Sequence, residues 1–330
     1  MPICGKRRPR WDWKLMIDKY IAYIRDIRRY SPRTQTLYAD ALNDFSAWCG
    51  GEPDLIPSRL REYEAHLIER GLKPRTVHLH MSALSGYCNF LIKEGQLKSN
   101  PVRGIKRPKM EKRLPEYYTE KSMEEYLQAS AHAAGEEELT ILQSLKPSDK
   151  LASELYNRRL RRLIVSLLYT TGIRRAELIG LQRSSVDTGR KTLRVKGKGD
   201  KMREIPLIPS ILEEISLYLQ AASSMVGVGS PQSPLLTTEK GAPLYPELVD
   251  RAVKTELDGY GITGRKSPHV LRHSLATALL DEGADLNAIK EMLGHANLAA
   301  TEVYTHNSIE RLKAQYMNAH PRAKNEESHD

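Results

Sequence analysis

Apolar residues recur at helical spacing through most of the chain, and only one stretch alternates as a β-strand does. Residues 14–98 predict four helices, and helical patterns return from residue 120 onward. The exception is two alternating runs, residues 192–196 and 202–207, joined by G-K-G-D, a sequence typical of a hairpin turn. The sequence therefore predicts a mainly α protein with a small antiparallel β-sheet that carries Lys198 in its turn.

The chain length of 330 residues favours two domains, each able to bury its own core. We place a helical domain at residues 14–98, a linker at 99–116, a larger domain at 117–312 and a C-terminal piece at 313–330. Within the larger domain we expect one helix over residues 120–134. Residues 135–150 are polar and acidic with weak periodicity, so we expect an insertion or a loose helix on the surface. They belong to an extra segment near residues 130–156, and the next helix should begin near Asn157.

The chain is strongly basic, with a net charge of +10 and an isoelectric point near 9.3. This charge favours a polyanionic partner, with nucleic acid ahead of a membrane surface, although solubility alone would also explain it. The linker mixes Pro and Gly with many Lys and Arg residues and shows no periodicity. If it crosses DNA rather than carrying solvated charge, its candidate contacts are Arg103, Lys106, Arg107 and Lys109.

Two of the N-terminal helices begin with similar tetrapeptides, S-P-R-T at residues 31–34 and K-P-R-T at 73–76. Each places an Arg and a Thr in the first turn, where free backbone N–H groups and the positive dipole end attract phosphate. Helix capping alone would explain the Ser and the Pro residues. We expect contacts to double-stranded DNA from Arg33, Thr34, Arg75 and Thr76.

Cysteine usage and hydropathy indicate a reduced, cytoplasmic protein. Cys4, Cys49 and Cys88 are scattered and lack the spacing of metal ligands. No apolar run approaches the ~18–20 residues that span a bilayer. The basic N-terminus lacks the apolar stretch of a signal peptide. We therefore expect no membrane partner.

Candidate chemistry gathers between residues 267 and 305. A helix that begins at Ser267 and ends at Gly283 should place His269, Arg272 and His273 on one face. A short second helix closes with L-G-H and delivers His295, and Tyr304 follows nine residues later. Arg174, just past the end of an apolar helix, is a further cation at the edge of the core. This set suits a phosphate-binding site with a nucleophile.

Other chemistries lack their defining residues. His269 and His273 have zinc-like spacing, but Val270 stands where a zinc protease has Glu, and no Cys is near. The G-K-G turn is too short for a P-loop, and no G-x-S-x-G is present. Fixed guanidinium and imidazole groups can neutralise a phosphoryl transition state without a metal. We therefore expect neither a metal nor a cofactor.

Five motifs carry a resemblance to a known family: T-G-I-R-R-A-E-L, V-K-G-K-G-D-K-x-R-E-I-P-L, H-V-L-R-H-S-x-A-T, L-G-H and V-Y-T-H. In this order they resemble the tyrosine site-specific recombinases, or phage integrase family. The ending E-R-L-K-A-x-Y-x-x-A-H-P-R-A is similar to the bacterial Xer-type subgroup. The resemblance covers roughly residues 14–323 and implies a helical core-binding domain followed by a catalytic domain.

The resemblance implies a role for each matching position. Arg174 and Arg272 resemble the two arginines that clamp the scissile phosphate, and His295 resembles the donor that assists them. Glu177 resembles a carboxylate that orients the site without reacting.

The remaining roles concern bond breaking and proton transfer. Tyr304 resembles the nucleophile that becomes linked to the 3′-phosphate, and His269 resembles the histidine that moves its proton. Lys198 resembles the general acid for the leaving 5′-oxygen, although Lys196 and Lys201 compete for that role.

A C-terminal helix from about residue 307 would carry Tyr316, the competing tyrosine, on its apolar stripe with Ile309 and Leu312. We therefore expect Tyr316 to pack rather than react. In the family such a segment packs onto the neighbouring protomer, so that a tetramer keeps two tyrosines active at a time.

The resemblance implies an enzyme that closes as a C-shaped clamp on duplex DNA and exchanges strands through a covalent 3′-phosphotyrosine and a Holliday junction. It would need neither ATP nor metal, and would act as a homo- or hetero-tetramer, with a second recombinase as a possible partner. Chromosome-dimer resolution and mobile-element integration or excision are the candidate roles. The alternatives are a type IB topoisomerase-like enzyme and a non-catalytic DNA-binding protein.

Overall fold

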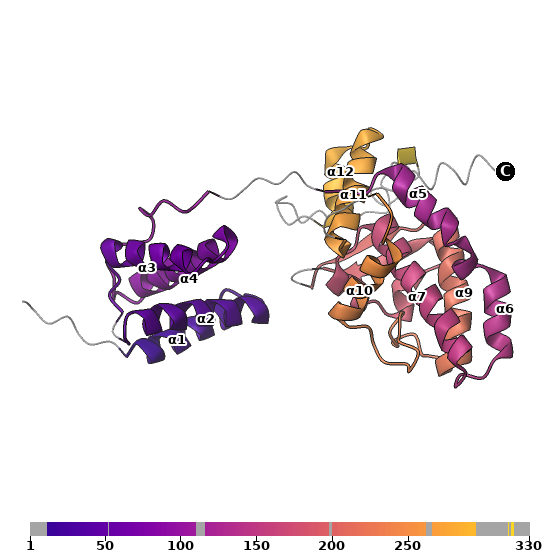
Figure 1. Ribbon diagram of the computed structural model, residues 1–330, viewed down its shortest axis with the longest axis horizontal. Helices are drawn as coiled ribbons and strands as arrows, with labels where there is room; N and C mark the ends of the chain where they lie inside the picture. The colour runs from indigo at the N-terminus through magenta and orange to yellow at the C-terminus, as the bar shows by residue number, and fades with distance from the viewer. Residues whose placement is uncertain are drawn as a thin grey trace, which may run out of the picture. The chain divides into compact units, whose positions relative to one another are not determined.

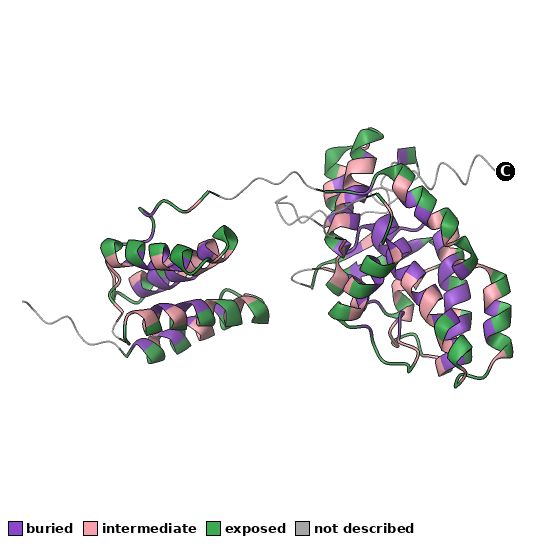
Figure 2. Cartoon of the chain, in the orientation of Figure 1, coloured by how far each residue is buried: buried purple, intermediate pink, exposed green. Residues whose placement is uncertain are grey.

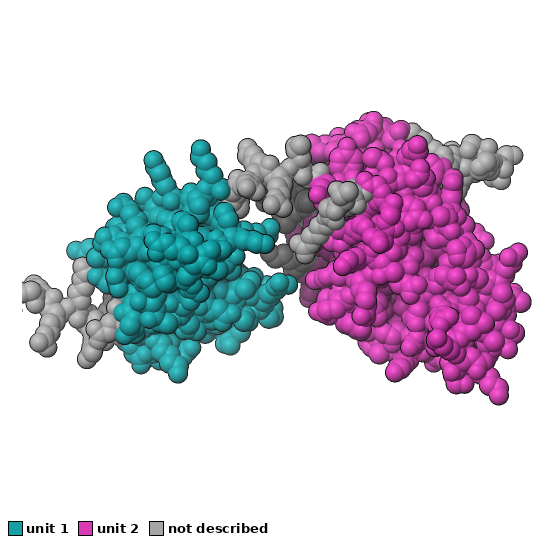
Figure 3. All heavy atoms as spheres, in the orientation of Figure 1, with its two compact units in different colours: residues 1–113 teal, residues 114–330 magenta. Residues whose placement is uncertain are grey.

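The computed structural model describes residues 12–51, 53–109, 116–197, 200–261 and 266–294, together with Tyr316, Asn318 and Ala319 (Figure 1). Its contacts divide the chain into two compact units, residues 1–113 and 114–330 (Figure 3), each with its own apolar core. The units are mostly helical, and one small antiparallel sheet lies in the second unit. The predicted fold class is confirmed.

The first unit contains the four predicted helices, three of which begin at a proline in the first helical position. They are α1 (Trp13–Asp26), α2 (Pro32–Trp48), α3 (Pro57–Glu69) and α4 (Pro74–Lys93). Each helix buries one apolar stripe in the core of this unit. In α1 the stripe ends at Ile24, because Ile27 lies past the last turn and is 65% exposed. In α2 the core position belongs to Leu42, which is fully buried, whereas Leu37 is exposed.

The first part of the basic segment at 99–116 packs onto α4 instead of forming a free connection. Val102 and Ile105 belong to the core of the first unit. Asn100 donates its side-chain amide to the carbonyl oxygen of Ser85, and Arg107 donates to the Ser82 hydroxyl at 3.0 Å. All four basic candidates in this segment remain exposed: Arg103, Lys106, Arg107 and Lys109.

The second unit is built around the long helix α7 (Lys150–Thr171), in which every residue from 162 to 171 is buried. It packs against α9, α10 and α11, and Figure 2 shows the buried residues concentrated along it. The helices around it are α5 (Glu120–Ala129), α6 (Glu136–Ser144), α8 (Arg175–Ile179), α9 (Pro209–Val226), α10 (Pro246–Glu256), α11 (Pro268–Asp281) and α12 (Leu286–Leu293). No helix among the described residues is long and apolar enough to cross a membrane.

The predicted hairpin is present as β2 (Thr192–Lys196) and β3 (Met202–Pro206), paired from Thr192 opposite Pro206 to Lys196 opposite Met202. A third strand, β1 (Val186–Asp187), lies on the other side of β2. It was not predicted, because two residues are too few to show an alternating pattern.

Residues 135–150, for which we expected a surface insertion or a loose surface helix, do form a helix, but this helix packs into the core. A short 3₁₀ helix, η1 (Ala131–Ala134), follows α5, and α6 then packs its Leu139 and Leu142 into the core beside α9. The next helix begins at Lys150, seven residues before the expected start. The polar, acidic sequence of residues 136–149 hid the apolar stripe, because α6 buries its core face through two leucines, Leu139 and Leu142.

We expect Leu142→Ala to destabilise the second unit if α6 belongs to its core. Leu142 is fully enclosed, so its truncation should lower the free energy of unfolding by about 2–5 kcal/mol in urea titrations. The matched control is Ile141→Ala in the same helix, where the side chain is 48% exposed and the change should stay near ~0.5 kcal/mol. Equal, small effects for both variants would contradict the packing of α6.

Candidate active site

A tight turn after α7 places Arg174. Gly172 ends the helix in a left-handed conformation with φ of +61°, and a Cβ there would lie 2.6 Å from Leu293 and 3.0 Å from Leu275. The backbone angle therefore favours glycine, and any side chain here would also displace the two leucine methyl groups. Arg174 is then the N-cap of α8, where its backbone N–H donates to the Glu177 carboxylate at 2.8 Å.

Glu177 is a buried carboxylate shared by two arginines. Arg174 Nη1 donates to Oε1 at 2.9 Å, and Arg203 of β3 forms two parallel bonds, Nη1 to Oε1 at 3.0 Å and Nη2 to Oε2 at 2.7 Å. Burial alone would raise the pKa of this carboxyl, but the hydrogen bonds from Arg203 and Arg174 hold it below its ordinary value. Glu177 is therefore charged at neutral pH.

Arg272 reaches the same place from α11. Its side chain is buried and donates to the carbonyl oxygens of Gly172 and Leu293. Burial, followed by the charges of Arg174 and Arg203, lowers the pKa of the Arg272 guanidinium to about 10. The guanidinium remains protonated at neutral pH, but its surroundings disfavour the charge.

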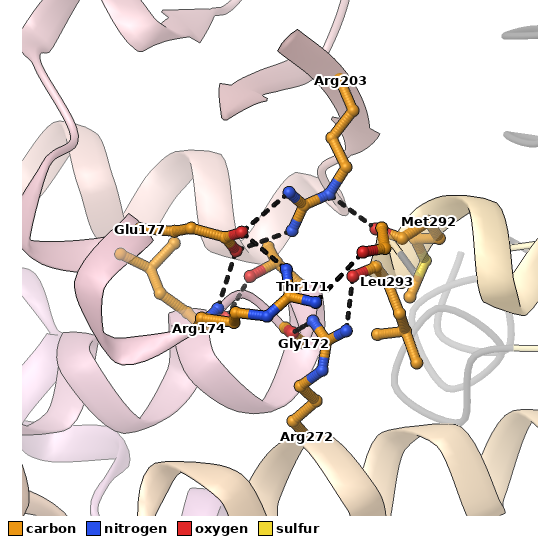
Figure 4. A network of polar contacts seen from close by, with 10 residues as sticks. Thr171, Gly172, Arg174, Glu177, Arg203, Arg272, Met292 and Leu293 are labelled. Carbon is orange, nitrogen blue, oxygen red and sulfur yellow. Dashed lines mark hydrogen bonds and ion pairs between the residues drawn. The ribbon is translucent and has the colours of Figure 1, made fainter. Parts of the chain in front are cut away.

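The C-terminal end of α12 joins the three arginines (Figure 4). Three successive carbonyl oxygens accept from three different guanidiniums: Met292 from Arg203 at 2.9 Å, Leu293 from Arg272, and Gly294 from Arg174 at 3.0 Å. The last carbonyls of a helix have no partner within it and carry the negative end of its dipole. The arginines therefore cap α12 and hold its end against α8 and β3.

The cluster carries more positive than negative charge. Within the part of the chain that the structure describes, the guanidiniums of Arg174, Arg203 and Arg272 lie around one carboxylate, that of Glu177, to which the first two bond. Helix-end carbonyls offset only part of this excess, because they are dipoles rather than full charges. An anion that reaches Arg174, whose side chain is 35% exposed, would relieve the imbalance. The arrangement is that of an anion-binding site.

The structure thus brings together three of the predicted residues: Arg174, Glu177 and Arg272. His269 is exposed in the first turn of α11. His273 does not share the contacts of Arg272, because its ring packs edge-on against Tyr117 with centroids 6.2 Å apart.

Three further predicted residues, Lys198, His295 and Tyr304, lie outside the described residues. Among the competitors, Lys196 pairs with Asp200 at 3.0 Å and is mostly exposed.

Tyr316 is buried, as its place on an apolar stripe predicted. Its hydroxyl donates to the Thr170 carbonyl oxygen at 2.6 Å, near the end of α7. Tyr316 and Ala319 belong to the core of their own unit. The packing of the remaining residues of 313–330 onto a neighbouring protomer stays a prediction.

The N-terminal DNA contacts need one revision. Arg33 and Arg75 are exposed, as expected of phosphate contacts. The backbone N–H of Thr34, however, donates to the Ser31 hydroxyl at 3.2 Å, and that of Thr76 donates to the Lys73 carbonyl oxygen at 2.8 Å. Local capping and turn bonds therefore occupy the N–H groups that were expected to be free.

The sequence interpretation missed Arg203, although a signal was present. Successive side chains of a strand point to opposite faces, and Arg203 lies on the same face of β3 as the buried Ile205. Its partner position on β2 is the buried Val195, so Arg203 faces the core. A charged residue at such a position needs a buried partner.

Comparison with known sequences agrees with this geometry. Residues 117–311 match the phage integrase family, and residues 17–95 match its N-terminal SAM-like domain. The chain belongs to the phage integrase family and is a tyrosine recombinase, an enzyme of site-specific DNA recombination.

Curated relatives support the same assignment over almost the whole chain. The tyrosine recombinase XerC of Bacillus licheniformis is 34% identical, with 94% of this chain and 97% of the relative covered. The XerC of Chlorobaculum parvum is 31% identical over 96% of each chain. Solved structures with a similar fold include the Tn1549 transposon integrase, with a TM-score of 0.61 and 19% identity over 90% of this chain and 98% of the integrase. The XerH site-specific recombinase has a TM-score of 0.60 and 19% identity over 93% of this chain and 83% of XerH.

Glu177→Gln should destabilise the second unit by about 3 kcal/mol at pH 7, because it leaves three guanidiniums without a carboxylate. The folded-state pKa of Glu177 lies below its ordinary 4.5, so its stabilisation is complete above that pH and is lost as the pH falls through the lower value. The difference in free energy of unfolding between wild type and Glu177→Gln should therefore become smaller below about pH 4.5.

Urea titrations between pH 7 and pH 3 would measure that difference. Asp200→Asn is the control, since Asp200 is an exposed carboxylate whose pair with Lys196 contributes little. A pH-independent difference for Glu177→Gln would contradict the assigned charge state.

Proposed function

We propose that this chain cuts and rejoins duplex DNA at specific sites through a covalent 3′-phosphotyrosine. The observation that carries the proposal is the cluster of Arg174 and Arg272, which has excess positive charge and is fixed on helix-end carbonyls. The substrate phosphodiester is an anion whose transition state places additional charge on the non-bridging oxygens. Guanidiniums held in advance by the fold can stabilise that charge without a metal.

Arg174 and Arg272 would bind the two non-bridging oxygens of the scissile phosphate. Each guanidinium has five N–H donors in a planar fork, so bonds to backbone carbonyls leave directions for phosphate. Glu177 would orient Arg174, and His295 would add a further donor. His295 follows directly on Gly294, whose carbonyl oxygen holds Arg174.

The cleavage step is a transfer between two oxygens. The Tyr304 Oη attacks phosphorus, the bond to the 5′-oxygen breaks, and a phosphotyrosine ester forms on the 3′ side. His269 takes the phenolic proton, and Lys198 gives a proton to the leaving 5′-oxygen. Attack by a 5′-hydroxyl of another strand reverses these transfers, so the bond energy is kept and neither ATP nor metal is needed.

DNA would be held by both units. We assign the four-helix domain at residues 14–98 to one face of the duplex, through Arg33 and Arg75, and the catalytic domain at 117–312 to the other. The exposed basic residues between them, Arg103 to Lys109, would contact phosphates as the chain closes in a C-shaped clamp. XerH bound to its difH substrate and the lambda integrase dimer bound to a core site are structural neighbours that bind DNA.

The proposed assembly is a tetramer that pairs two sites and proceeds through a Holliday junction. Its subunits would be identical or would include a second recombinase, and residues 313–330 would contribute to contacts between neighbours. The candidate roles are chromosome-dimer resolution and mobile-element integration or excision.

Wild-type protein should form a covalent complex with a nicked duplex, and Tyr304→Phe should form none while still binding DNA. The nick lets a short fragment diffuse away and traps the ester. Duplexes from the chromosome-terminus region and from DNA flanking the gene would be compared on denaturing gels, without metal. Tyr316→Phe is the matched control and should retain the covalent band.

The outcomes separate the alternatives. A band that persists in Tyr304→Phe and disappears in Tyr316→Phe would reassign the nucleophile. Bound DNA without a band on any duplex would favour a non-catalytic DNA-binding protein. Relaxation of supercoiled plasmid without exchange between two sites would favour a topoisomerase-like enzyme.

DNA affinity should fall steeply with salt, since each phosphate contact releases a counterion. Arg33→Ala and Arg75→Ala should each reduce the slope of log K against log[salt] by about one, as measured by fluorescence anisotropy. Arg59→Ala serves as a control, because Arg59 covers the Trp48 ring and bonds to Glu62. Slopes unchanged in both Arg variants would remove these residues from the DNA contacts.

A further inference from the structure

Arg203 has no role in the proposed phosphate clamp, yet it joins two parts of the cluster. It donates to both oxygens of Glu177 and to the Met292 carbonyl oxygen, and it is buried. We propose that Arg203 is a positioning residue: it holds Glu177 so that the carboxylate forms a single side-chain bond with Arg174, and it fixes the end of α12. This inference rests on the proposed function, because it assigns Arg174 to the phosphate.

The hydrogen-bond geometry supports a competition for Glu177. Arg203 makes two parallel bonds with the carboxylate, whereas the Arg174 side chain makes one, through Nη1. A two-bond pair is the stronger arrangement for an arginine and a carboxylate. Glu177 therefore forms its two-bond pair with Arg203 and only one side-chain bond with Arg174, which leaves the other donors of Arg174 for an incoming anion. Without Arg203, the carboxylate would be able to form the two-bond pair with Arg174 instead.

Two glycines pack directly on the Arg203 guanidinium. A Cβ on Gly197 would lie 3.3 Å from Nη1, and a Cβ on Gly294 would lie 3.3 Å from both Cζ and Nη1. Both distances are closer than ordinary side-chain contacts. Gly197 directly precedes Lys198 and Gly294 directly precedes His295 in the sequence. Arg203 therefore contacts the backbone immediately before two residues of the proposed site.

The contacts require arginine in particular. Three N–H groups in one plane meet the two Glu177 oxygens and the Met292 carbonyl oxygen. The ammonium group of lysine is a compact donor on a flexible stem and lacks this planar fork. Lysine would retain the charge but would lose part of the hydrogen-bond geometry. The cleavage rate with lysine at this position should therefore lie between that of the wild type and that of a variant with a neutral residue.

The first test measures single-turnover cleavage of the nicked duplex with protein in saturating excess. Arg203→Met should slow covalent-complex formation about 100-fold, the scale of an ångström-sized misplacement in a site. Arg203→Lys should be intermediate, and the dissociation constant for DNA should change by less than about threefold in both, because Arg203 is buried away from DNA. Equal losses of binding and rate would overturn the positioning role.

Arg194 provides the matched control. It lies on the neighbouring strand β2, is about half exposed, and has only distant carboxylate partners at 3.8 Å. Arg194→Met removes the same charge from the same sheet and should leave both rate and binding unchanged. A loss equal to that of Arg203→Met would assign the effect to net charge and overturn the proposal.

A double variant gives a readout that a purely structural role would not produce. Glu177→Gln should slow cleavage in the wild-type background, where Glu177 orients Arg174. In the Arg203→Met background the same change should raise the cleavage rate about tenfold above that of Arg203→Met alone, because the neutral amide no longer neutralises Arg174. Losses that multiply in the double variant would refute the competition for Glu177.

Hydrogen–deuterium exchange tests Arg203 independently of activity and covers the case of a poorly folding Met variant. In Arg203→Lys, peptides covering α8 and the end of α12 should exchange faster, while those of α9 should not change. Unchanged exchange at α12 would overturn the positioning role even if cleavage slows. If exchange is faster in Arg203→Lys but the wild-type protein forms no covalent complex with DNA, Arg203 is still a positioning residue and the proposed function is rejected.

Discussion

The second unit depends on one electrostatic arrangement. Three arginines from α8, β3 and α11 cap the C-terminal end of α12, and two of them, Arg174 and Arg203, share the carboxylate of Glu177. Helix ends need partners for their last carbonyls, and here guanidiniums supply all three bonds. The cap therefore ties together four elements that are distant in sequence. Because the arginines are held by these bonds, their positions are set before any ligand binds.

The same arrangement is costly in the absence of a ligand, since one carboxylate faces three cations in a largely buried place. The depressed pKa of Arg272 records that cost. In the proposed function, this unfavourable charge becomes favourable when a phosphodiester binds. The fold and the proposed catalysis would then use the same side chains, and Glu177 and Arg203 would determine how much of the charge remains available.

Much of this fold followed from local sequence patterns. Helical stripes, Pro at helix starts and Gly at helix ends identified the four N-terminal helices, α11 and α12, and strand alternation identified the hairpin. The pattern failed between residues 135 and 150, where the sequence is polar and acidic and its apolar residues show little periodicity. It also failed for the two-residue strand β1. In both places, contacts between distant segments decided the structure.

The sequence by itself determined the family and the identity of the proposed site residues, because five motifs in order specify both. It also determined the conformation of Gly172 and Gly294, where a helix must end before a functional residue. Only the tertiary structure decided which cations meet one carboxylate, how Arg203 joins them, and that His273 turns to Tyr117 instead. The reason is physical: local spacing sets which face of an element a side chain occupies, whereas its partners come from elements that approach only when the core packs.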